Sequence, residues 1–316
     1  MRATARGGWV AAVVVAVAAA LGLPAAPAQA ASGAGDVSAA AAFRLDVRSA
    51  RVEGRSVAYA EAGPARGVPL LLLNGTGSPM SQWDPAFLAA LSSQRRVVVY
   101  DYPGLGGSTA LPGRLTFDRL ADDASGLLDA IGEPRADVLG WSMGGFVAQR
   151  LAVRHPDRVR ALVLAGTNPG GPRAVLGPTW VQDEDSDPDA GLTDYVRTNY
   201  PAGHRAAGWA FVRRVNAAID AGRYPPDTVP QRTYDAMVAA EDPWLRSSRN
   251  LRQLGALAVP TLVVTGAKDV VTPPANSRLI AATIPGARLV LAPDAGHSFL
   301  FQRPSATARL VDAFLP

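Results

Sequence analysis

The fold of this chain is decided by the stretch Val138-Leu139-Gly140-Trp141-Ser142-Met143-Gly144-Gly145. It begins as an apolar strand, passes through the pattern Gly-x-Ser-x-Gly and continues into a helix-like segment, residues 146–154. A serine on such a strand-to-helix turn has its hydroxyl pushed outward, where it can act as a nucleophile. The flanking glycines have no Cβ, so strand and helix can approach closely. Because Gly and Ser are also common in ordinary turns, the surrounding sequence has to distinguish the two interpretations.

Buried strands and helices alternate on both sides of this stretch. Short apolar runs bounded by turn residues are typical of strands buried on both faces, and amphipathic segments between them indicate helices. This alternation predicts an α/β fold with a mostly parallel, eight-stranded sheet, helices on both faces and an antiparallel start. The expected strands are residues 43–52, 56–61, 68–73, 96–100, 136–141, 159–165, 260–265 and 287–291, and the expected helices are 85–92, 117–131, 146–154, 276–284 and 305–315.

The alternation stops between about residues 169 and 256. This stretch is long for a loop and has helical character of its own, as in residues 234–240. We therefore expect an insertion that folds over the carboxyl edge of the sheet as a cap. Some of its aromatic side chains should line an apolar pocket above Ser142, and others should pack the cap onto the core. The insertion holds eight of the 21 aromatic residues, namely Trp180, Tyr195, Tyr200, Trp209, Phe211, Tyr224, Tyr234 and Trp244.

A serine nucleophile needs a base that removes its proton, and histidine is the natural base. The chain has three histidines. His155 lies where a helix ends before a proline, and His204 lies in the cap segment. His297 follows the last strand, at the carboxyl edge of the sheet, where Ser142 also lies. We therefore predict that His297 is the base.

The acid that orients this base should follow another strand, between the nucleophile and the base. Asp269 lies just past the strand at 260–265, although it could also cap the following helix. Asp294 is the alternative, but it lies only three residues before His297, which is too close in sequence to orient the ring. The predicted triad is therefore Ser142, Asp269 and His297, in that chain order.

The third requirement is an oxyanion hole, formed by two donors aimed at the oxygen on which negative charge develops. The residue after the nucleophile, Met143, should supply one backbone N–H. The second should come from the loop after Leu73, where Gly75 and Gly77 leave the backbone accessible. We predict the backbone N–H of Thr76 as that donor, and the alternative is that this loop is an ordinary Asn-Gly turn.

From about residue 43 to the C-terminus the chain resembles serine hydrolases of the α/β-hydrolase superfamily. The resemblance rests on Gly140-Trp141-Ser142-Met143-Gly144, Asp101-x-x-Gly104-x-Gly106-x-Ser108, Gly266-x-x-Asp269-x-x-x-Pro273 and Gly296-His297. Members commonly carry His-Gly in the oxyanion loop, where this chain has Asn74-Gly75. The serine argues against the haloalkane dehalogenase and epoxide hydrolase branches, which use aspartate as nucleophile.

This resemblance implies an esterase-like enzyme that needs no cofactor or metal. Ser142 would attack the carbonyl of a small or medium apolar carboxylic ester, with His297 as base and Asp269 as its partner. The N–H groups of Met143 and Thr76 would stabilise the oxyanion, and water would release the acyl group. Cofactor-free perhydrolase (haloperoxidase) activity and aminopeptidase activity are alternatives on the same triad. A further alternative is a non-catalytic binding protein, because fold does not fix function.

The N-terminal segment has the pattern of a secretory signal peptide. Two arginines precede the apolar run 9–23, which is short for a transmembrane span, and Ala28-Gln29-Ala30 offers small residues for a signal peptidase. We therefore predict a signal peptide over 1–30, a flexible leader over 31–42 and a hydrolase domain over 43–316. The predicted location is outside the cell, and the alternative is a membrane anchor formed by an uncleaved N-terminal segment.

Composition narrows the remaining functions. Cysteine is absent, which excludes disulfides, a thiol nucleophile and a cysteine-ligated metal. The net charge of +4 includes two arginines in 1–30, and we see no basic run interleaved with aromatics, so we expect a small-molecule ester and not nucleic acid as partner. The acidic segment 183–194 places oxygen ligands at alternate positions, as a calcium loop does. Its sixth position is Pro188, which cannot adopt positive φ, so we expect a solvated acidic loop.

Overall fold

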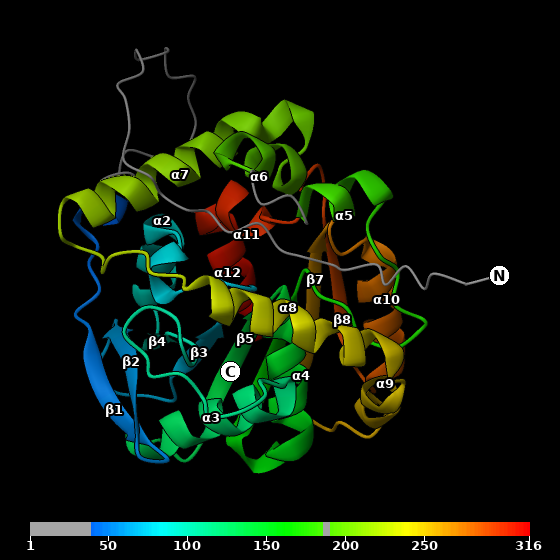
Figure 1. Cartoon of the computed structure of the whole chain (residues 1–316), viewed down its shortest axis with the longest axis horizontal. Helices are drawn as coiled ribbons and strands as arrows, with labels where there is room; N and C mark the ends of the chain where they lie inside the picture. Colours follow the sequence, from blue (N-terminus) through cyan, green and yellow to red (C-terminus); the bar gives the residue numbers. More distant parts are fainter. Residues whose placement is uncertain (1–38, 186–189) are drawn as a thin grey trace.

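A single eight-stranded sheet forms the centre of the computed structural model, which describes residues 39–185 and 190–316 (Figure 1). The strands are β1 (Arg48–Val52), β2 (Arg55–Ala62), β3 (Leu70–Leu73), β4 (Val97–Tyr100), β5 (Ala136–Trp141), β6 (Val159–Ala165), β7 (Thr261–Gly266) and β8 (Arg288–Ala292). Their order is β1-β2-β4-β3-β5-β6-β7-β8. Only β2 runs antiparallel to its neighbours, and the other pairs are parallel. The predicted mostly parallel sheet with an antiparallel start is confirmed.

Helices cover both faces of this sheet and bury its central strands. Every residue of β3, β4, β5 and β7 is buried, as the continuous Val- and Leu-rich runs of these strands require. One face packs against α3 (Phe117–Ala130), α4 (Met143–Arg154) and α10 (Pro274–Thr283), and the other against α2 (Pro85–Ser92), α11 (Phe299–Gln302) and α12 (Pro304–Phe314). Between β4 and β7 the carboxyl ends of the parallel strands meet at one edge, where the loops that carry the predicted site residues begin.

Five helices lie in the described part of the segment that joins β6 to β7. They are α5 (Thr179–Asp185), α6 (Leu192–Asn199), α7 (Arg205–Asp220), α8 (Gln231–Arg246) and α9 (Arg249–Leu254). In Figure 1, α6 and α7 cross the top of the view and α8 passes in front of the sheet. Side chains of α6 and α7 join the core cluster of α2, α11 and α12, whereas those of α8 and α9 join the cluster of α3, α4 and α10.

Polar contacts attach this cap segment to the rest of the domain. Asp84 caps α2 by accepting a hydrogen bond from the backbone N–H of Ala86 at 2.9 Å, and its side chain also pairs with Arg214 of α7. Asp84 is fully buried, and the Arg214 side chain is partly exposed. One carboxylate therefore fixes both the start of α2 and the position of α7.

Several element boundaries differ from the predictions. The first strand begins at Arg48, and residues 39–42, predicted as part of the leader, form a helical turn in which Ala40 is buried. Helix α4 begins at Met143, immediately after the serine, because the two glycines that follow are helical. Helix α11 was not predicted. The predicted signal peptide, residues 1–30, lies outside the described residues.

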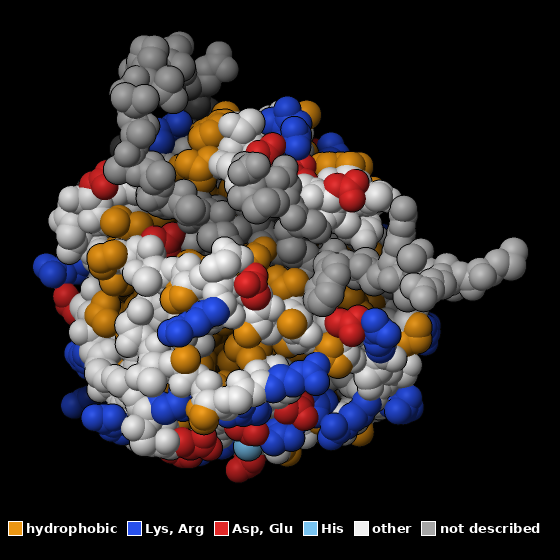
Figure 2. All heavy atoms as spheres, viewed as in Figure 1, with side chains coloured by type: hydrophobic (Ala, Val, Ile, Leu, Met, Phe, Trp, Pro, Cys, Tyr) orange, Lys and Arg blue, Asp and Glu red, His pale blue; other side chains and the backbone are white. Residues whose placement is uncertain are grey.

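None of the helices in the described part of the chain combines the length and the apolar character that crossing a bilayer requires. On the face shown in Figure 2, Lys and Arg side chains lie among acidic side chains along the lower edge. Apolar side chains gather around a hollow near the middle of that face.

Candidate active site

Ser142 occupies a strained turn between β5 and α4. Its φ and ψ angles are 55° and −123°, a conformation that residues with a side chain rarely adopt. The chain tolerates it because strand and helix are packed very closely: a Cβ on Gly140 would lie 2.2 Å from the carbonyl oxygen of Gly144, and a Cβ on Gly144 would lie 2.0 Å from that of Leu73. The glycines of the motif are therefore steric requirements, and the turn leaves Ser142 partly exposed.

His297 and Asp269 form a buried pair beside this serine. The Nδ1 atom of His297 lies 2.9 Å from Oδ2 of Asp269, and both side chains are almost completely buried. His297 and Ser142 line the same cavity. The ring of Trp141 lies 5.3 Å from the imidazole, centroid to centroid, and its Nε1 donates a hydrogen bond to the carbonyl oxygen of His297 at 3.1 Å. This contact fixes the loop that carries the histidine.

Asp269 is held by four further donors. Its Oδ1 accepts from the backbone N–H groups of Val271 and Thr272, each at 2.9 Å, and its Oδ2 accepts from the hydroxyls of Thr265 at 3.1 Å and Thr272 at 2.9 Å. Donors of this kind stabilise an ionised carboxylate. An ionised Asp269 bonded to Nδ1 leaves the Nε2 atom of His297 to accept a proton.

The predicted oxyanion loop lies directly beside the serine. A Cβ on Gly75 would lie 3.6 Å from the Cβ of Ser142. The N–H of Gly75 is already engaged, because it donates to Oδ1 of Asn74 at 2.9 Å. By contrast, the N–H groups of Thr76 and Met143 have no hydrogen-bond partner among residues 39–185 and 190–316. These two groups are the donors that a developing oxyanion could use.

The cap helix α8 holds this loop through two side chains on one of its faces. The hydroxyl of Thr76 donates to Oε1 of Glu241 at 3.0 Å. The N–H of Gly77 lies 3.4 Å from Sδ of Met237, which is one helical turn before Glu241. The position of the loop therefore depends on the cap.

Asp101, from the second motif, fixes the other end of the same loop. Its Oδ1 accepts from the N–H of Met80 at 2.7 Å, and its Oδ2 accepts from that of Gly107 at 2.9 Å. Burial raises the pKa of the Asp101 carboxyl to about 6, although both hydrogen bonds act in the opposite direction. Asp101 is therefore a structural residue of the loop next to the site.

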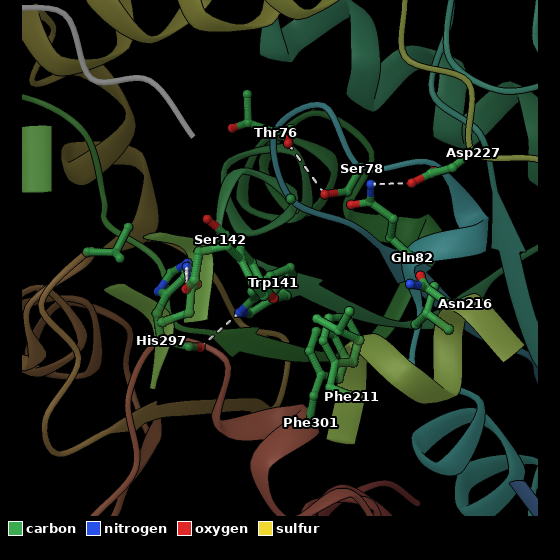
Figure 3. Close-up of a pocket in the computed structure, with 16 residues that line it drawn as sticks. Thr76, Ser78, Gln82, Trp141, Ser142, Phe211, Asn216, Asp227, His297 and Phe301 are labelled. Carbon is green, nitrogen blue, oxygen red and sulfur yellow. Dashed lines mark hydrogen bonds between the residues drawn. The ribbon is translucent and has the colours of Figure 1, made fainter. Parts of the chain in front are cut away.

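The cavity above Ser142 is apolar in its middle and polar at both ends. Figure 3 shows Ser142 and His297 at one end, Gln82, Asn216 and Asp227 at the other, and aromatic side chains between them. The apolar lining comes from β5, the cap, the loop after β7 and α11, namely Trp141, Phe211, Val212, Val215, Val271 and Phe301. Such a cavity suits an apolar chain with a carbonyl at the serine end.

The cap aromatics divide as predicted between pocket and packing. Tyr195 and Phe211 line the cavity. Trp244 packs against Phe146 of α4 with ring centroids 5.0 Å apart. Trp180 is largely exposed.

The other two histidines and the alternative acid, Asp294, do not take part in the His297–Asp269 pair. His155 lies at the end of α4, with Nε2 2.7 Å from Asp122, and His204 ends a short 3-10 turn, Ala202–His204. Asp294 is exposed and pairs with Lys268 at 2.7 Å, which lowers the pKa of its carboxyl. It does not orient His297.

The predicted acidic loop over 183–194 is described only in part. It begins inside helix α5, where the buried Glu184 bonds Arg197 and Thr198. Residues 186–189, which include the central positions of the calcium-like pattern, lie outside the described residues. Across the ranges that are described, no cluster of three His, Cys, Asp or Glu side chains could hold a metal ion.

Sequence reasoning missed Thr272, Glu241 and the polar end of the cavity. Thr272 carried a readable signal, because a Thr three residues after an Asp can donate both its N–H and its hydroxyl to that carboxylate. Glu241 and Asn216 carried none, since each reaches the site only through the fold of the cap.

The family model of the alpha/beta hydrolase fold matches residues 68–304. Among curated proteins, the chain is 29% identical to a poly(3-hydroxyalkanoate) depolymerase of Ectopseudomonas oleovorans, covering 85% of this chain and 92% of that protein. It is 30% identical to the putative non-heme bromoperoxidase BpoC of Mycobacterium tuberculosis, covering 79% and 94%. It is 31% identical to a pimeloyl-[acyl-carrier protein] methyl ester esterase of Neisseria meningitidis, covering 77% and 91%.

The matches cover nearly the whole length of these relatives, and the range of the family model includes the Ser142 turn, the Asp269 loop and His297. The expected superfamily resemblance is confirmed, and the relatives support hydrolase activity. The chain belongs to the alpha/beta hydrolase fold family.

Proposed function

We propose that this protein is a serine hydrolase that cleaves a carboxylic ester of a small or medium apolar substrate through an acyl-enzyme intermediate. The observation that carries the proposal is the arrangement of Ser142 on its strained turn, in one cavity with a His297 whose Nδ1 is bonded to Asp269. The methyl ester esterase among the relatives supports the ester as the bond attacked.

Each step follows from one part of this geometry. His297 accepts the proton of Ser142 through Nε2 while the serine oxygen attacks the ester carbonyl. Asp269 stabilises the imidazolium that forms. The negative charge on the carbonyl oxygen is stabilised by the unengaged N–H groups of Met143 and Thr76. His297 then gives its proton to the leaving alcohol, and a water molecule activated by the same histidine releases the acid.

The test is the hydrolysis of p-nitrophenyl butyrate by the wild-type protein and by Ser142→Ala. We expect the variant to lose at least about 10³-fold in kcat while its circular dichroism spectrum stays unchanged. A fluorophosphonate probe should label the wild-type protein and leave the variant unlabelled. Equal turnover by the two proteins would overturn the proposal. A folded wild-type protein that the probe does not label would instead favour a non-catalytic binding protein.

Perhydrolase activity is a second candidate, because one relative is named a putative non-heme bromoperoxidase. On this triad the acyl-enzyme would be attacked by hydrogen peroxide in place of water, giving a peracid that oxidises bromide. Bromination of a reporter in acetate, bromide and peroxide measures it. A bromination rate that exceeds ester hydrolysis by wild type, and that Ser142→Ala abolishes, would favour this candidate.

We also propose that the protein is exported through the signal peptide at residues 1–30. The succession of charged start, apolar run and Ala28-Gln29-Ala30 supports this proposal. Expression of the full chain in a bacterial host, followed by N-terminal sequencing of the product outside the cytoplasm, tests it. We expect the mature chain to begin at Ala31, and an intact N-terminus in the membrane fraction would favour the anchor.

A further inference from the structure

The end of the cavity opposite Ser142 carries three polar side chains that the proposed reaction does not use. Gln82 comes from the short 3-10 turn Met80–Gln82, Asn216 comes from α7, and Asp227 comes from the segment between α7 and α8. All three line the cavity, and Figure 3 shows them at the end away from Ser142 and His297. They come from three separate segments of the chain, two of them in the cap.

Asp227, one of these three polar side chains, has a structural role. Asp227 accepts a hydrogen bond from the hydroxyl of Ser81 at 2.9 Å and another from Nε2 of Gln82 at 2.8 Å. These bonds join the cap to the 3-10 turn. Burial raises the pKa of the Asp227 carboxyl, and these two donors only partly offset that effect. No Lys or Arg is among the described side chains that line the cavity to neutralise the carboxylate.

One polar atom at this end of the cavity has no hydrogen-bond partner within the described parts of the chain. Oδ1 of Asn216 is buried and receives no hydrogen bond from any described residue. The amide of Gln82 lies beside it in the cavity lining, with Nε2 donating to Asp227. Burying an amide oxygen without a donor is unfavourable, so such atoms are normally satisfied by a ligand or by water. The far end of the cavity thus presents one buried acceptor without a donor, Oδ1 of Asn216, beside the Asp227 carboxylate.

An apolar chain that begins at Ser142 would pass the aromatic middle of the cavity before it meets these acceptors. A methyl terminus would leave Oδ1 of Asn216 unsatisfied, and so would a group that only accepts hydrogen bonds. A terminal hydroxyl or amino group would supply the missing donor. Discrimination of this kind is strong, because the analogue that lacks the donor leaves buried polar atoms unpaired.

We propose that Gln82, Asn216 and Asp227 form a specificity subsite for a hydrogen-bond-donating group at the far end of the substrate, so that the preferred substrate is an ester carrying a hydroxyl or amino group at the end of an apolar chain. The inference rests on the proposed esterase function, since it places the ester carbonyl at Ser142. Asn216 is the specificity-determining residue to test, because its amide oxygen has no structural role among the recorded contacts.

Two matched ester series test the proposal on the wild-type protein. In one series the acyl chain ends in methyl, methoxy, hydroxyl or amino, with lengths of about four to ten carbons. In the other the alcohol chain varies in the same way on a butyrate ester. At the best length in one series we expect kcat/KM for the hydroxyl or amino ester to exceed that for its methyl-terminated match by about tenfold. The methoxy ester should gain nothing. The hydroxyl and amino arms distinguish a neutral donor from a cation.

Asn216→Leu removes the acceptor and keeps the number and branching of the side-chain heavy atoms. We expect this variant to lose the preference for the donor-terminated ester, so that the ratio of kcat/KM between the donor-terminated and the methyl-terminated ester falls from about tenfold to about one. Ala217→Leu, at the exposed neighbouring position on α7, is the control and should keep the wild-type preference. Binding of the same esters to Ser142→Ala, measured by calorimetry, gives a readout that does not require turnover.

The outcomes separate the two proposals. Hydrolysis of methyl-terminated esters through Ser142 with no donor preference in either series overturns the subsite and leaves the esterase intact. A preference that persists in Asn216→Leu also overturns the subsite. Absence of hydrolysis, together with tighter binding of donor-terminated esters to Ser142→Ala, supports the subsite and overturns the esterase. Absence of both hydrolysis and preferential binding overturns both.

Discussion

Thr76 and Glu241 are joined by a hydrogen bond of 3.0 Å from the threonine hydroxyl to Oε1 of the carboxylate. The two residues lie 165 positions apart in the chain, and both are buried. Thr76 belongs to the loop after β3, whereas Glu241 belongs to helix α8 of the cap. A cap residue outside the cavity lining therefore contacts the loop that carries the Thr76 N–H, one of the two proposed oxyanion donors.

The first prediction concerns this positioning role. Glu241→Leu should lower kcat by about tenfold with KM changed by less than about twofold, because a displaced oxyanion donor weakens binding of the transition state more than that of the substrate. Thr76→Val removes the same hydrogen bond from the other side and should have the same effect. Glu241→Gln retains an acceptor for the Thr76 hydroxyl and should stay near wild type. Steady-state kinetics on one ester measure all three.

Non-additivity provides the control. If the hydrogen bond is the cause, the double variant Glu241→Leu/Thr76→Val should be no slower than the slower single variant. Additive losses, or a rise in KM with unchanged kcat, would show that Glu241 acts on the pocket and not on the oxyanion loop.

The second prediction concerns the acid of the proposed triad. Asp269→Asn should lower kcat by about 10³- to 10⁴-fold, because the amide favours the wrong histidine tautomer and cannot stabilise the imidazolium. The hydrogen bonds from Val271 and Thr272 should keep the loop in place, so the melting temperature should change little. As a comparison, Asp294→Asn removes the exposed carboxylate that pairs with Lys268 and should leave kcat unchanged. A loss in Asp294→Asn that matched the loss in Asp269→Asn would reverse the assignment of the acid.

The third prediction concerns the glycines of the nucleophile turn. Gly144→Ala should destabilise the fold by about 3 kcal/mol or more, since its Cβ would lie 2.0 Å from the backbone oxygen of Leu73 in a buried strand. Gly203→Ala is the matched control, because a Cβ there meets no atom within 4 Å and its φ is not positive. That variant should stay within about 0.5 kcal/mol of wild type. Urea unfolding measures both free energies.

Sequence reasoning located the strands well because their burial is recorded in continuous apolar runs. Residues 136–141 and 159–165 were predicted with the bounds of β5 and β6, and the helix at 85–92 with those of α2. Each of these segments carries its own signal, either a Val- and Leu-rich run or an Asp-Pro start. The start of α4 was misplaced by three residues, because glycines at 144 and 145 conceal a helix whose first turn is stabilised by packing and not by propensity.

The candidate site was predictable to the extent that topology decides it. Ser142, Asp269 and His297 each follow a strand, and parallel strands bring their carboxyl ends together. The cap contacts could not be predicted in this way. Glu241 and Asn216 are ordinary residues of amphipathic helices, and their importance arises only from where α7 and α8 pack.

The fourth prediction uses the pKa of Asp101, which burial raises from its ordinary value near 4 to about 6. A raised carboxyl pKa means that the folded state binds the proton more tightly, so the stability of the wild-type protein falls as pH rises through this window. Titration of Asp101 should lower the free energy of unfolding of the wild-type protein by about 3 kcal/mol across this window. Asp101→Asn lacks this titration, so its free energy of unfolding relative to wild type should rise between pH 4 and pH 7. Urea unfolding across that range measures it.

A constant offset between the two proteins is expected, since the amide oxygen introduced by Asp101→Asn can accept only one of the two backbone hydrogen bonds that the carboxylate accepts. Only the change with pH reports the titration. Asp46→Asn, at an exposed position, shows the general effect of removing one carboxyl. If the Asp101→Asn and wild-type profiles run parallel, the Asp101 carboxyl does not titrate in this window.

The last prediction separates the strain at Ser142 from its chemistry. With φ at 55° and ψ at −123°, any residue with a Cβ is strained at this position, and glycine is not. Ser142→Gly and Ser142→Ala should therefore both be inactive, but Ser142→Gly should be the more stable by about 1 kcal/mol. Glycine also gives the unfolded chain more conformational entropy, which lowers stability. The expected advantage of about 1 kcal/mol for Ser142→Gly already includes this cost. Equal stability of the two variants, measured by urea unfolding, would mean that the turn relaxes once the hydroxyl is removed. Greater stability of the glycine variant would identify the nucleophile turn as a site where stability is given up for reactivity.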